Sequence, residues 1–434
     1  MRFLHTSDWH LGRTFHGGSL LDEQRAMVDA IVEIAEQHHV DAVIIAGDLF
    51  DRAIPPVEAV ELWESAVARL RLTGAVVIAI SGNHDSARRV SVHSRLLESG
   101  GVFLRGSIEC CDEPILVESR HGAAPVAVYA VPYLDPVAAR SVFGEAAFEP
   151  LEAGSIVADD ASASDGDGDG DGDGADIDAE TDAETDAETD RPIRRRRVTH
   201  RSITAAAMAS VRADLETREV SGTVVVAHTF VGGGVSSESE RDITLGNVEQ
   251  VPLTVFEGIG YVALGHLHGP QVFEGGRITY SGSPLPYSFS EEHHRKCVRI
   301  IDLDADGAVD VETVQLPAIM RLATLSGTLD DLLHDSSFAD HEGSYVRAQL
   351  TDVHLPLNAM ARLRDRFARA VELRHTPTGS ELTGSATINA AQRRELPPLE
   401  LTRSFFNDQE GRDPTDDELE WLDAALAQAM GVQR

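Results

Sequence analysis

Five short clusters of aspartate, asparagine and histidine residues each follow a stretch expected to form a β-strand. Alone, an Asp-x-His or Gly-His-x-His pattern is more often a turn or a hydrogen-bonded histidine than a metal site. Five clusters in this order are very hard to obtain by chance, so we predict a metal site. The clusters are Asp8-Trp9-His10, Gly47-Asp48-Leu49-Phe50-Asp51, Gly82-Asn83-His84-Asp85, His228 and Gly265-His266-Leu267-His268.

The residue types and their placement indicate which metals would bind. Side chains that follow neighbouring strands of an open α/β sheet meet in one crevice at the carboxyl ends of those strands. Two residues at spacing two on an extended segment, such as Asp8 and His10, point to the same side. A mixed shell of histidine, carboxylate and amide groups suits manganese, iron or zinc better than magnesium or calcium. The pattern predicts a binuclear cage.

The elements that would position these clusters alternate between helix and strand. Residues 22–38 have apolar residues at a helical period, and the wholly apolar run 42–46 is typical of a buried strand. The pattern repeats with a helix over 57–72 and a strand over 75–80. A third helix is predicted over 202–217, followed by strands over 223–227 and 260–264. This alternation predicts an α/β layer fold.

The chain of 434 residues has a formal net charge of −35, which is unusual for a protein that binds nucleic acid. Residues 159–190 carry fifteen acids and no bases, so −35 + 15 leaves −20 on the rest. Bound divalent cations would add local positive charge that this count omits. No apolar run is long enough to span a bilayer, and no secretory signal is evident, so we expect a cytoplasmic protein with no membrane partner.

Composition and periodicity also divide the chain. Residues 155–197 contain Asp-Gly and Thr-Asp-Ala-Glu repeats and then four arginines, a composition that predicts a disordered insertion. From about residue 316 the pattern becomes strand, helix, strand, helix, strand, with the second helix over 357–370. We predict a main domain over 1–315, a small α+β domain over 316–395 and a helical segment over 396–434.

The clusters together resemble the signature of the calcineurin-like metallophosphoesterases. Within that superfamily, three stretches are similar to the SbcD-type DNA nucleases, and Asp85 and Ala53 depart from the protein phosphatase pattern. The stretches are Ser237-Glu238-Ser239-Glu240-Arg241, Tyr280-Ser281-Gly282-Ser283-Pro284 and Ser288-Phe289-Ser290-Glu291. The resemblance implies a four-layer α/β/β/α sandwich with a small capping domain.

The resemblance also implies a role for each residue. One metal would be held by Asp8, His10, Asp48 and His268, and the other by Asn83, His228 and His266, with Asp48 bridging both. The ions, expected to be Mn²⁺, would lower the pKa of water from about 16 toward 7 so that it attacks phosphorus. His84 would be the acid or transition-state donor. Asp51 would orient His84 through a histidine–carboxylate pairing, or would instead cap a helix.

The implied activity is that of a DNA nuclease, both a 3′-to-5′ exonuclease and a single-strand endonuclease. The resemblance further implies a homodimer that joins an SbcC-type ATPase in a heterotetramer for DNA end processing, repair and recombination. The terminal helical segment would dock on that ATPase, although its apolar stripe at Leu419, Leu422, Leu426 and Met430 could equally pack on the chain's own core. Alternatives are a phosphatase or small-molecule phosphodiesterase on the same metal core, or a scaffold for the ATPase.

Overall fold

The computed structural model describes residues 1–118, 124–143, 198–240, 250–304 and 307–377, and in the C-terminal region residues 397, 399–403, 406 and 412–429. The insertion predicted over 155–197, Arg241 and Met430 lie outside these residues. None of the described helices is long and apolar enough to cross a membrane.

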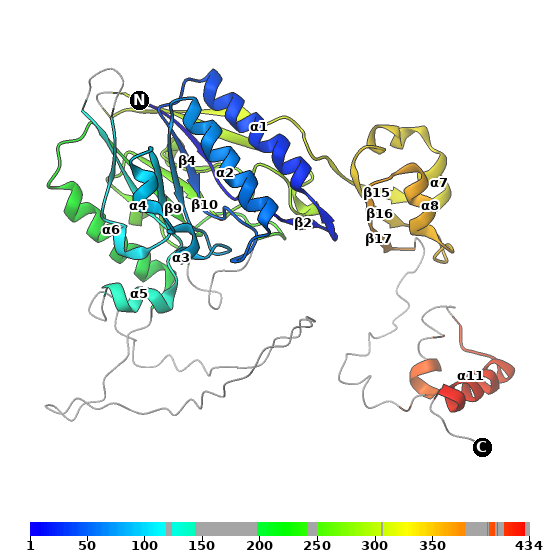
Figure 1. The fold of residues 1–434 in the computed structure, drawn as a ribbon. Helices are drawn as coiled ribbons and strands as arrows, with labels where there is room; N and C mark the ends of the chain where they lie inside the picture. The colour runs from blue at the N-terminus through cyan, green and yellow to red at the C-terminus, as the bar shows by residue number, and fades with distance from the viewer. Residues whose placement is uncertain are drawn as a thin grey trace, which may run out of the picture.

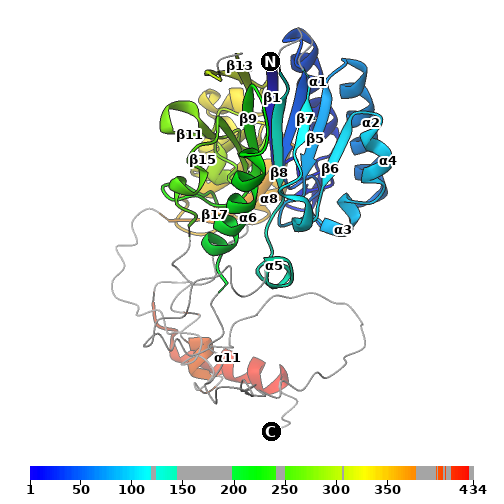
Figure 2. The same cartoon turned by 90° about the vertical axis from the view of Figure 1, so that its left-hand side faces the viewer.

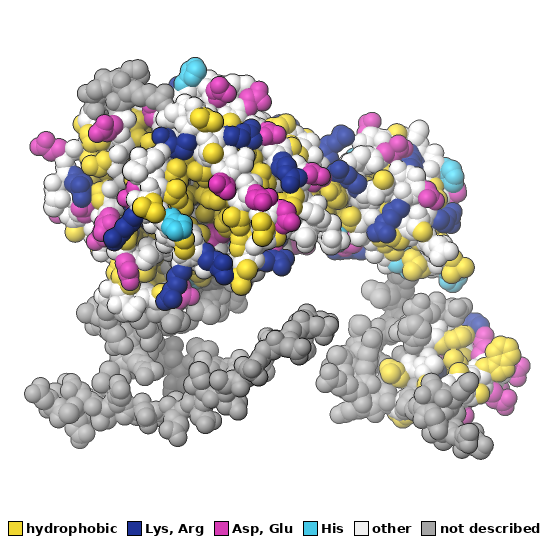
Figure 3. All heavy atoms as spheres, in the orientation of Figure 1, with side chains coloured by type: hydrophobic (Ala, Val, Ile, Leu, Met, Phe, Trp, Pro, Cys, Tyr) yellow, Lys and Arg dark blue, Asp and Glu magenta, His cyan; other side chains and the backbone are white. Residues whose placement is uncertain are grey.

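Two six-stranded sheets form the main body of the molecule (Figures 1 and 2). In the first sheet β1, β4, β5 and β6 are parallel, and β13 and β14 add an antiparallel edge. Its strands, in spatial order, are β14 (Val309–Gln315), β13 (Cys297–Leu303), β1 (Arg2–Thr6), β4 (Ala42–Ala46), β5 (Val76–Ile80) and β6 (Val102–Arg105). Helices α1 (Leu21–Gln37) and α2 (Val57–Leu72) cover its outer face, where Met27 and Ile31 of α1 are fully buried. On the solvent side of these helices, hydrophobic side chains gather between charged ones of both signs (Figure 3).

The second sheet is also mostly parallel. Its strands, in spatial order, are β11 (Gln271–Phe273), β12 (Ile278–Tyr280), β10 (Tyr261–Gly265), β9 (Gly222–His228), β8 (Val126–Val131) and β7 (Ile115–Val117). Helices α5 (Pro136–Phe143) and α6 (His200–Leu215) lie on its outer face, and α6 buries Ile203, Met208 and Val211 there.

The inner faces of the two sheets pack against each other. Phe3, Ile44, Val128, Val226 and Tyr261 belong to one buried cluster that joins strands of both sheets. The layer order is therefore helix, sheet, sheet, helix, and the predicted four-layer α/β/β/α class is confirmed. Because β4, β8, β9 and β10 are covered on both faces, they consist almost entirely of buried residues, as the apolar run 42–46 predicted for β4.

A smaller unit follows, with three parallel strands and a hydrophobic core of its own (Figure 1). Its elements are β15 (Leu322–Gly327), α7 (Leu329–His334), β16 (Tyr345–Leu350), α8 (Ala359–Arg366) and β17 (Ala370–His375). The second helix is shorter than predicted. Asn358 before it is left-handed, with φ 54°, and Phe367 after it is non-helical and buried, so the helix can extend in neither direction. The domain limits at 315 and 395 remain predictions.

Short elements complete the described fold. They are β2 (Thr14–Phe15), β3 (Gly18–Ser19), α3 (Ala87–Val90), α4 (Ser94–Glu98), η1 (Ile108–Cys110), η3 (Leu253–Phe256), η4 (Glu274–Gly276), η5 (Phe289–Glu291), η6 (Ser336–His341) and the terminal helix α11 (Asp416–Ala429). Of these, η5 matters most for function because it lies between the small unit and the predicted metal site. Thr324 of β15 donates a hydrogen bond to Glu292, the residue that ends η5.

Candidate metal centre

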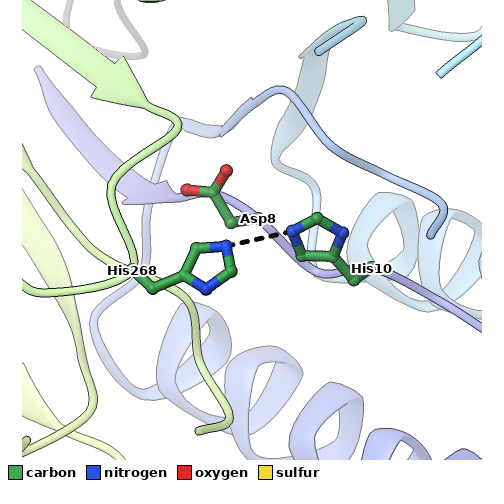
Figure 4. A group of neighbouring side chains, drawn as sticks. All are labelled: Asp8, His10 and His268. Atoms are coloured by element: carbon green, nitrogen blue, oxygen red, sulfur yellow. Dashed lines mark hydrogen bonds between the residues drawn. The ribbon is translucent and has the colours of Figure 1, made fainter. Parts of the chain in front are cut away.

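The carboxyl ends of β1, β4, β9 and β10 bring the predicted ligands together. Asp8, His10 and His268 form one group in which the ligand atoms lie within 4.8 Å of one another, and all three residues are buried (Figure 4). Asp8, Asp48 and His228 form a second group by the same measure. Asp8 and Asp48 are therefore placed so that each could serve more than one ion.

Asn83 and His266 complete the predicted set. Asn83 Oδ1 lies 2.9 Å from His228 Nε2. The imidazole of His266 lies with its centroid 5.5 Å from that of His228, and its backbone N–H donates to both carboxylate oxygens of Asp8. All seven residues predicted as ligands thus converge on one region, although their binding of metal stays a prediction.

The backbone is strained at four of the predicted ligands. Asp8, His10, Asp48 and His266 have φ angles of 54°, 45°, 47° and 109°. Positive φ is uncommon outside glycine, and such residues cluster at sites where the surrounding structure enforces a functional geometry. Asp8 N–H donates to Gly47 O and His10 N–H donates to Asp48 O, so the loops after β1 and β4 hold each other in this conformation.

The protonation of His228 indicates that a cation belongs beside it. Its Nδ1 lies 3.0 Å from Ala46 O, so this nitrogen carries the proton and donates it. Its Nε2 is then a lone-pair acceptor, yet it faces Asn83 Oδ1, which is also an acceptor. Two acceptors 2.9 Å apart repel unless a cation coordinates both, so this pair fits a metal ligand set.

His268 and His10 face each other with their Nε2 atoms in the same cage (Figure 4). Ser239 donates its hydroxyl proton to Glu291 and accepts from His268 Nδ1, which leaves His268 Nε2 unprotonated. This Nε2 lies 3.1 Å from His10 Nε2, while the buried His10 Nδ1 has no hydrogen-bond partner among the described residues. The pair can share a proton between the two Nε2 atoms, or both atoms can bind a divalent ion if the His10 proton moves to Nδ1, which lies 3.8 Å from Asp51 Oδ1.

Burial shapes the electrostatics of the cage. Burial, and then the negative charge of Asp48, raises the pKa of Asp8 well above its usual range. Burial also lowers the pKa values of His10 and His266 well below the ordinary value of histidine, and lowers that of His228. The cage therefore favours neutral imidazoles, the form that ligates metals, and it gathers carboxylates whose charge a divalent cation would compensate.

His84 lies beside the same cage. It forms a group with His10 and Asp48 in which the candidate ligand atoms are within 4.8 Å of one another. Its Nδ1 lies 2.7 Å from the backbone carbonyl oxygen of Asp51. Asp51 therefore holds His84 through its main chain, which corrects the predicted pairing through the Asp51 carboxylate.

The Asp51 side chain makes other contacts. Its Oδ1 lies 3.8 Å from His10 Nδ1 and 3.6 Å from Arg13 Nη1. The alternative interpretation of Asp51 as a helix cap is wrong for the helix that follows, since the N-cap position of α2 is Pro56.

Asp85 organises the loops of the site, which the sequence did not reveal. Its two carboxylate oxygens accept backbone N–H groups from Leu49, Phe50 and Gly82. This ties the loop after β4, which carries Asp48, to the loop after β5, which carries Asn83. Burial, and then the charge of Asp48, raises the pKa of Asp85 to about 7.

A second set of residues without a predicted role surrounds His268. Ser239 and Glu240 both hydrogen-bond to it, and Glu291 and Lys296 lie behind them. The sequence singled out Ser237–Arg241 and Ser288–Glu291 only as stretches similar to the SbcD-type nucleases. Burial alone would raise the pKa of Glu291, but the charge and hydrogen bond of Lys296 and the nearby His268, whose Nδ1 lies 3.6 Å from Glu291 Oε1, lower it well below its usual range.

Comparison with known proteins agrees with this geometry for the first half of the main body. Residues 1–125 match the family model of the calcineurin-like phosphoesterases. The match spans β1 to β7 and so includes Asp8, His10, Asp48, Asn83 and His84. The match supports a calcineurin-like phosphoesterase domain over this part of the chain, and that family consists of metal-dependent hydrolases of phosphoesters. The match does not reach His228, His266 or His268.

Two solved structures are similar over most of their length. TT1561 of Thermus thermophilus is 13% identical, with a TM-score of 0.34, and the alignment covers 72% of this chain and 98% of that one. A dimetal phosphatase from Danio rerio is 13% identical, with a TM-score of 0.38 and coverage of 73% and 99%.

Proposed function

We propose that this protein is a two-metal phosphodiesterase that cuts DNA, as a 3′-to-5′ exonuclease and a single-strand endonuclease. The observation that carries the choice of a polymeric substrate is an arginine-lined groove beside the metal cage. The groove is lined from the main body by Arg13, His16 and Tyr287 and from the small unit by Arg347 and Arg374. Guanidinium groups bind phosphate oxygens well, and nucleic-acid affinity comes largely from such contacts.

The groove extends from the cage toward the small unit. Arg13 stands at the inner end, 3.6 Å from the Asp51 carboxylate, with its guanidinium 4.8 Å from the centre of the Tyr287 ring. At the outer end Arg347 and Arg374 share one carboxylate partner, Glu372. Three arginines and two glutamates, Glu238 and Glu372, line the groove, so its lining is slightly positive although the net charge of the chain is −35.

The residues of the cage divide the chemical work. Asp8, His10, Asp48 and His268 would hold one ion, and Asn83, His228 and His266 the other. Bound divalent ions, for which we propose Mn²⁺, would supply the Lewis acidity that lowers the pKa of water and neutralises charge on the phosphoryl group.

His84 is proposed to donate a proton or a hydrogen bond to the reacting phosphate. Because its Nδ1–H is engaged by the Asp51 carbonyl, the neutral ring presents an acceptor at Nε2. Only the imidazolium form can donate from Nε2. The Asp51 carbonyl stabilises that form by accepting the Nδ1–H, and this main-chain contact fixes the orientation of the ring.

The proposal is tested by Mn²⁺-dependent cleavage of end-labelled single- and double-stranded DNA. We expect His84→Ala to lose at least about 100-fold in cleavage rate while keeping its metals, because a positioned acid contributes roughly 10²–10⁴-fold. Asp48→Ala should lose both cleavage and metal, since it removes the bridging carboxylate. If the wild type leaves DNA intact but hydrolyses a small phosphodiester or a phosphomonoester, the metal site is supported and DNA is rejected as the substrate.

A matched pair of arginine variants tests the groove itself. Arg374→Ala should weaken DNA binding several-fold and reduce the salt slope of the affinity by about 1, as expected for one lost phosphate contact. The control is Arg69→Ala, because Arg69 pairs with Asp29 across α1 and α2 and lies outside the groove. Equal effects of the two variants would contradict the assignment of the groove.

We also propose that the chain forms a homodimer that binds an SbcC-type ATPase, with the small unit acting as a cap. The ATPase docking is supported by Trp421 of α11, which is 78% exposed. The dimer is supported by Val57 and Val60 at the start of α2, which are 69% and 43% exposed. Sedimentation should give a dimer that Val57→Glu dissociates, and Trp421→Ala should abolish co-purification with the ATPase. A wild-type monomer, or unchanged co-purification, would reject the respective partner.

A further inference from the structure

His268 is held at three of its polar atoms by side chains of other segments. Its Nδ1 lies 2.5 Å from Ser239 Oγ, and its backbone N–H donates to Glu240 Oε1 at 2.7 Å. Its backbone carbonyl accepts from Lys296 Nζ at 3.0 Å. The ring can neither rotate nor shift without breaking one of these bonds.

Behind this first ring of contacts lies a buried ion pair. Lys296 Nζ is 2.5 Å from Glu291 Oε2, and the two side chains are 8% and 0% exposed. Glu291 Oε1 accepts the Ser239 hydroxyl at 2.6 Å, and Lys296 also donates to Ser283 Oγ. Burial of an ion pair is costly, and its net gain in stability over apolar residues is often nil. A functional reason for the pair is therefore expected.

The direction of the hydrogen bonds supplies that reason. Glu291 can only accept, so the Ser239 hydroxyl must donate to it and must accept from His268 Nδ1–H. His268 is thereby kept in the tautomer whose Nε2 lone pair faces the cage. If Glu291 were replaced by a donor, the serine hydroxyl could turn toward Nδ1 and shift the ring proton to Nε2.

We propose that Glu291 and Lys296 are positioning residues of the metal centre, which act through Ser239 to fix the tautomer and orientation of His268. They would raise the affinity of one of the two metal positions, the one shared by Asp8, His10 and His268. His228 needs no such relay because its Nδ1 is held by a main-chain oxygen. The inference rests on the metal centre of the proposed function but not on DNA as its substrate.

The test is a chelator titration of the full-length chain loaded with Mn²⁺. Wild type, Glu291→Gln, Lys296→Met and Lys296→Arg are dialysed against graded EDTA, and the Mn²⁺ retained per chain is measured. We expect Glu291→Gln and Lys296→Met to lose one ion at about 10- to 100-fold lower chelator activity, the usual effect of removing such a partner. The second ion should leave as in wild type, and Lys296→Arg should restore much of the loss.

The matched control is Glu292→Gln, which changes the neighbouring carboxylate in the same turn. Glu292 bonds to Thr324 of the small unit, whereas the carboxylate that Ser239 reaches is that of Glu291. The electron paramagnetic resonance spectrum of bound Mn²⁺ gives a readout besides activity, because loss of one ion removes the coupling between the pair. This spectrum should change in Glu291→Gln and stay unchanged in Glu292→Gln.

Several results would overturn the proposal. It fails if folded Glu291→Gln releases both ions as wild type does, if both ions weaken equally, or if Glu292→Gln behaves in the same way. Should Glu291→Gln not fold, Ser239→Ala decides, since it removes the hydroxyl that joins Glu291 to His268 Nδ1, whose direct separation of 3.6 Å is too long for a hydrogen bond. A wild type that binds two Mn²⁺ but spares DNA would reject the substrate and leave this test intact, whereas a wild type that binds none would reject both proposals.

Discussion

His268 and His228 face the same cage, but different parts of the chain hold them. His268 is fixed by the side chains of Ser239, Glu240 and Lys296. His228 is fixed by the carbonyl oxygen of Ala46, which is a main-chain atom of β4. One half of the metal centre therefore depends on residue identity in distant loops, and the other depends on the packing of two sheets.

The difference determines how each half can change. A single side-chain substitution can remove a partner of His268, whereas no substitution at position 46 removes its carbonyl. The contact that holds His228 can be broken from the β4 side only by forcing the strands apart. Side-chain substitutions can therefore adjust the metal affinity of the His268 half, whereas the main-chain contact keeps the His228 half rigid.

The largest effect is expected from Gly265→Ala, which attacks the backbone-held half. A Cβ atom at residue 265 would lie 1.7 Å from Ala46 O and 3.0 Å from His228 Nδ1. Because the first contact is with main chain, β4 and β10 must separate to admit the methyl group. We expect a loss of stability of about 3 kcal/mol or more, at the upper end for overpacked cores, and loss of metal at the His228 position.

Gly222→Ala is the matched control for this prediction. Gly222 begins β9, the strand that ends at His228, and an added Cβ would make only ordinary contacts of 3.7 Å with Leu303 and Val126. Thermal unfolding and metal content should stay close to wild type. Near-wild-type behaviour of Gly265→Ala would mean that the two sheets can move apart and that the contrast between the halves is misplaced.

Removal of metal should weaken both halves, with an effect that depends on pH. The buried histidines are neutral in the folded chain and, above about pH 7.5, mostly neutral in the unfolded chain too, so they add little pH dependence there. Asp8, with its strongly raised pKa, and Asp85, with a pKa of about 7, keep protons in the metal-free fold that the unfolded chain has lost. Their contribution to stability therefore falls as pH rises from about 4, the pKa of aspartate in the unfolded chain, up to these raised values, by at most about 1.4 kcal/mol per pH unit for each group.

We therefore expect the melting temperature of EDTA-treated protein to fall between about pH 7 and about pH 8. The Mn²⁺-loaded protein should show a flatter profile, because bound cations favour the ionised carboxylates. Below about pH 6.5 the buried histidines make stability rise with pH, because they stay neutral in the folded chain but are protonated in the unfolded chain. Parallel profiles for loaded and stripped protein would argue against metals as the partners of these carboxylates.

The metal cage was largely predictable from the sequence, because its residues follow strands whose apolar runs are easy to recognise. Parallel strands place their carboxyl ends at one edge, so Asp8, Asp48 and His228 had to meet once the strands were correct. The helix over 57–72 was predicted at its observed limits, because its apolar spacing and the preceding prolines agree.

The supporting contacts were not predictable in the same way. Ser239 and Glu291 are 52 residues apart in loops without a periodic pattern, so only the tertiary fold brings them together. The partner of His84 is the carbonyl of Asp51, and every residue type has a carbonyl, so the sequence suggested the carboxylate instead. Asp85 likewise binds backbone N–H groups, which no motif spacing reveals.

The smallest effect should come from the junction with the small unit. Thr324 of β15 donates to Glu292, which adjoins the Glu291 of the relay. Thr324→Val should lower the Mn²⁺ affinity of the His268 half by less than about threefold and leave the other half unchanged. The effect is small because one hydrogen bond contributes roughly 1 kcal/mol and this one reaches Glu291 only through its neighbour Glu292. Thr328→Val is the control, since Thr328 caps α7 within the small unit through Asp331. An effect of Thr324→Val as large as that of Ser239→Ala would show that the small unit holds His268 as firmly as the relay does. An equal effect of Thr328→Val would show that general loosening of the small unit is the cause.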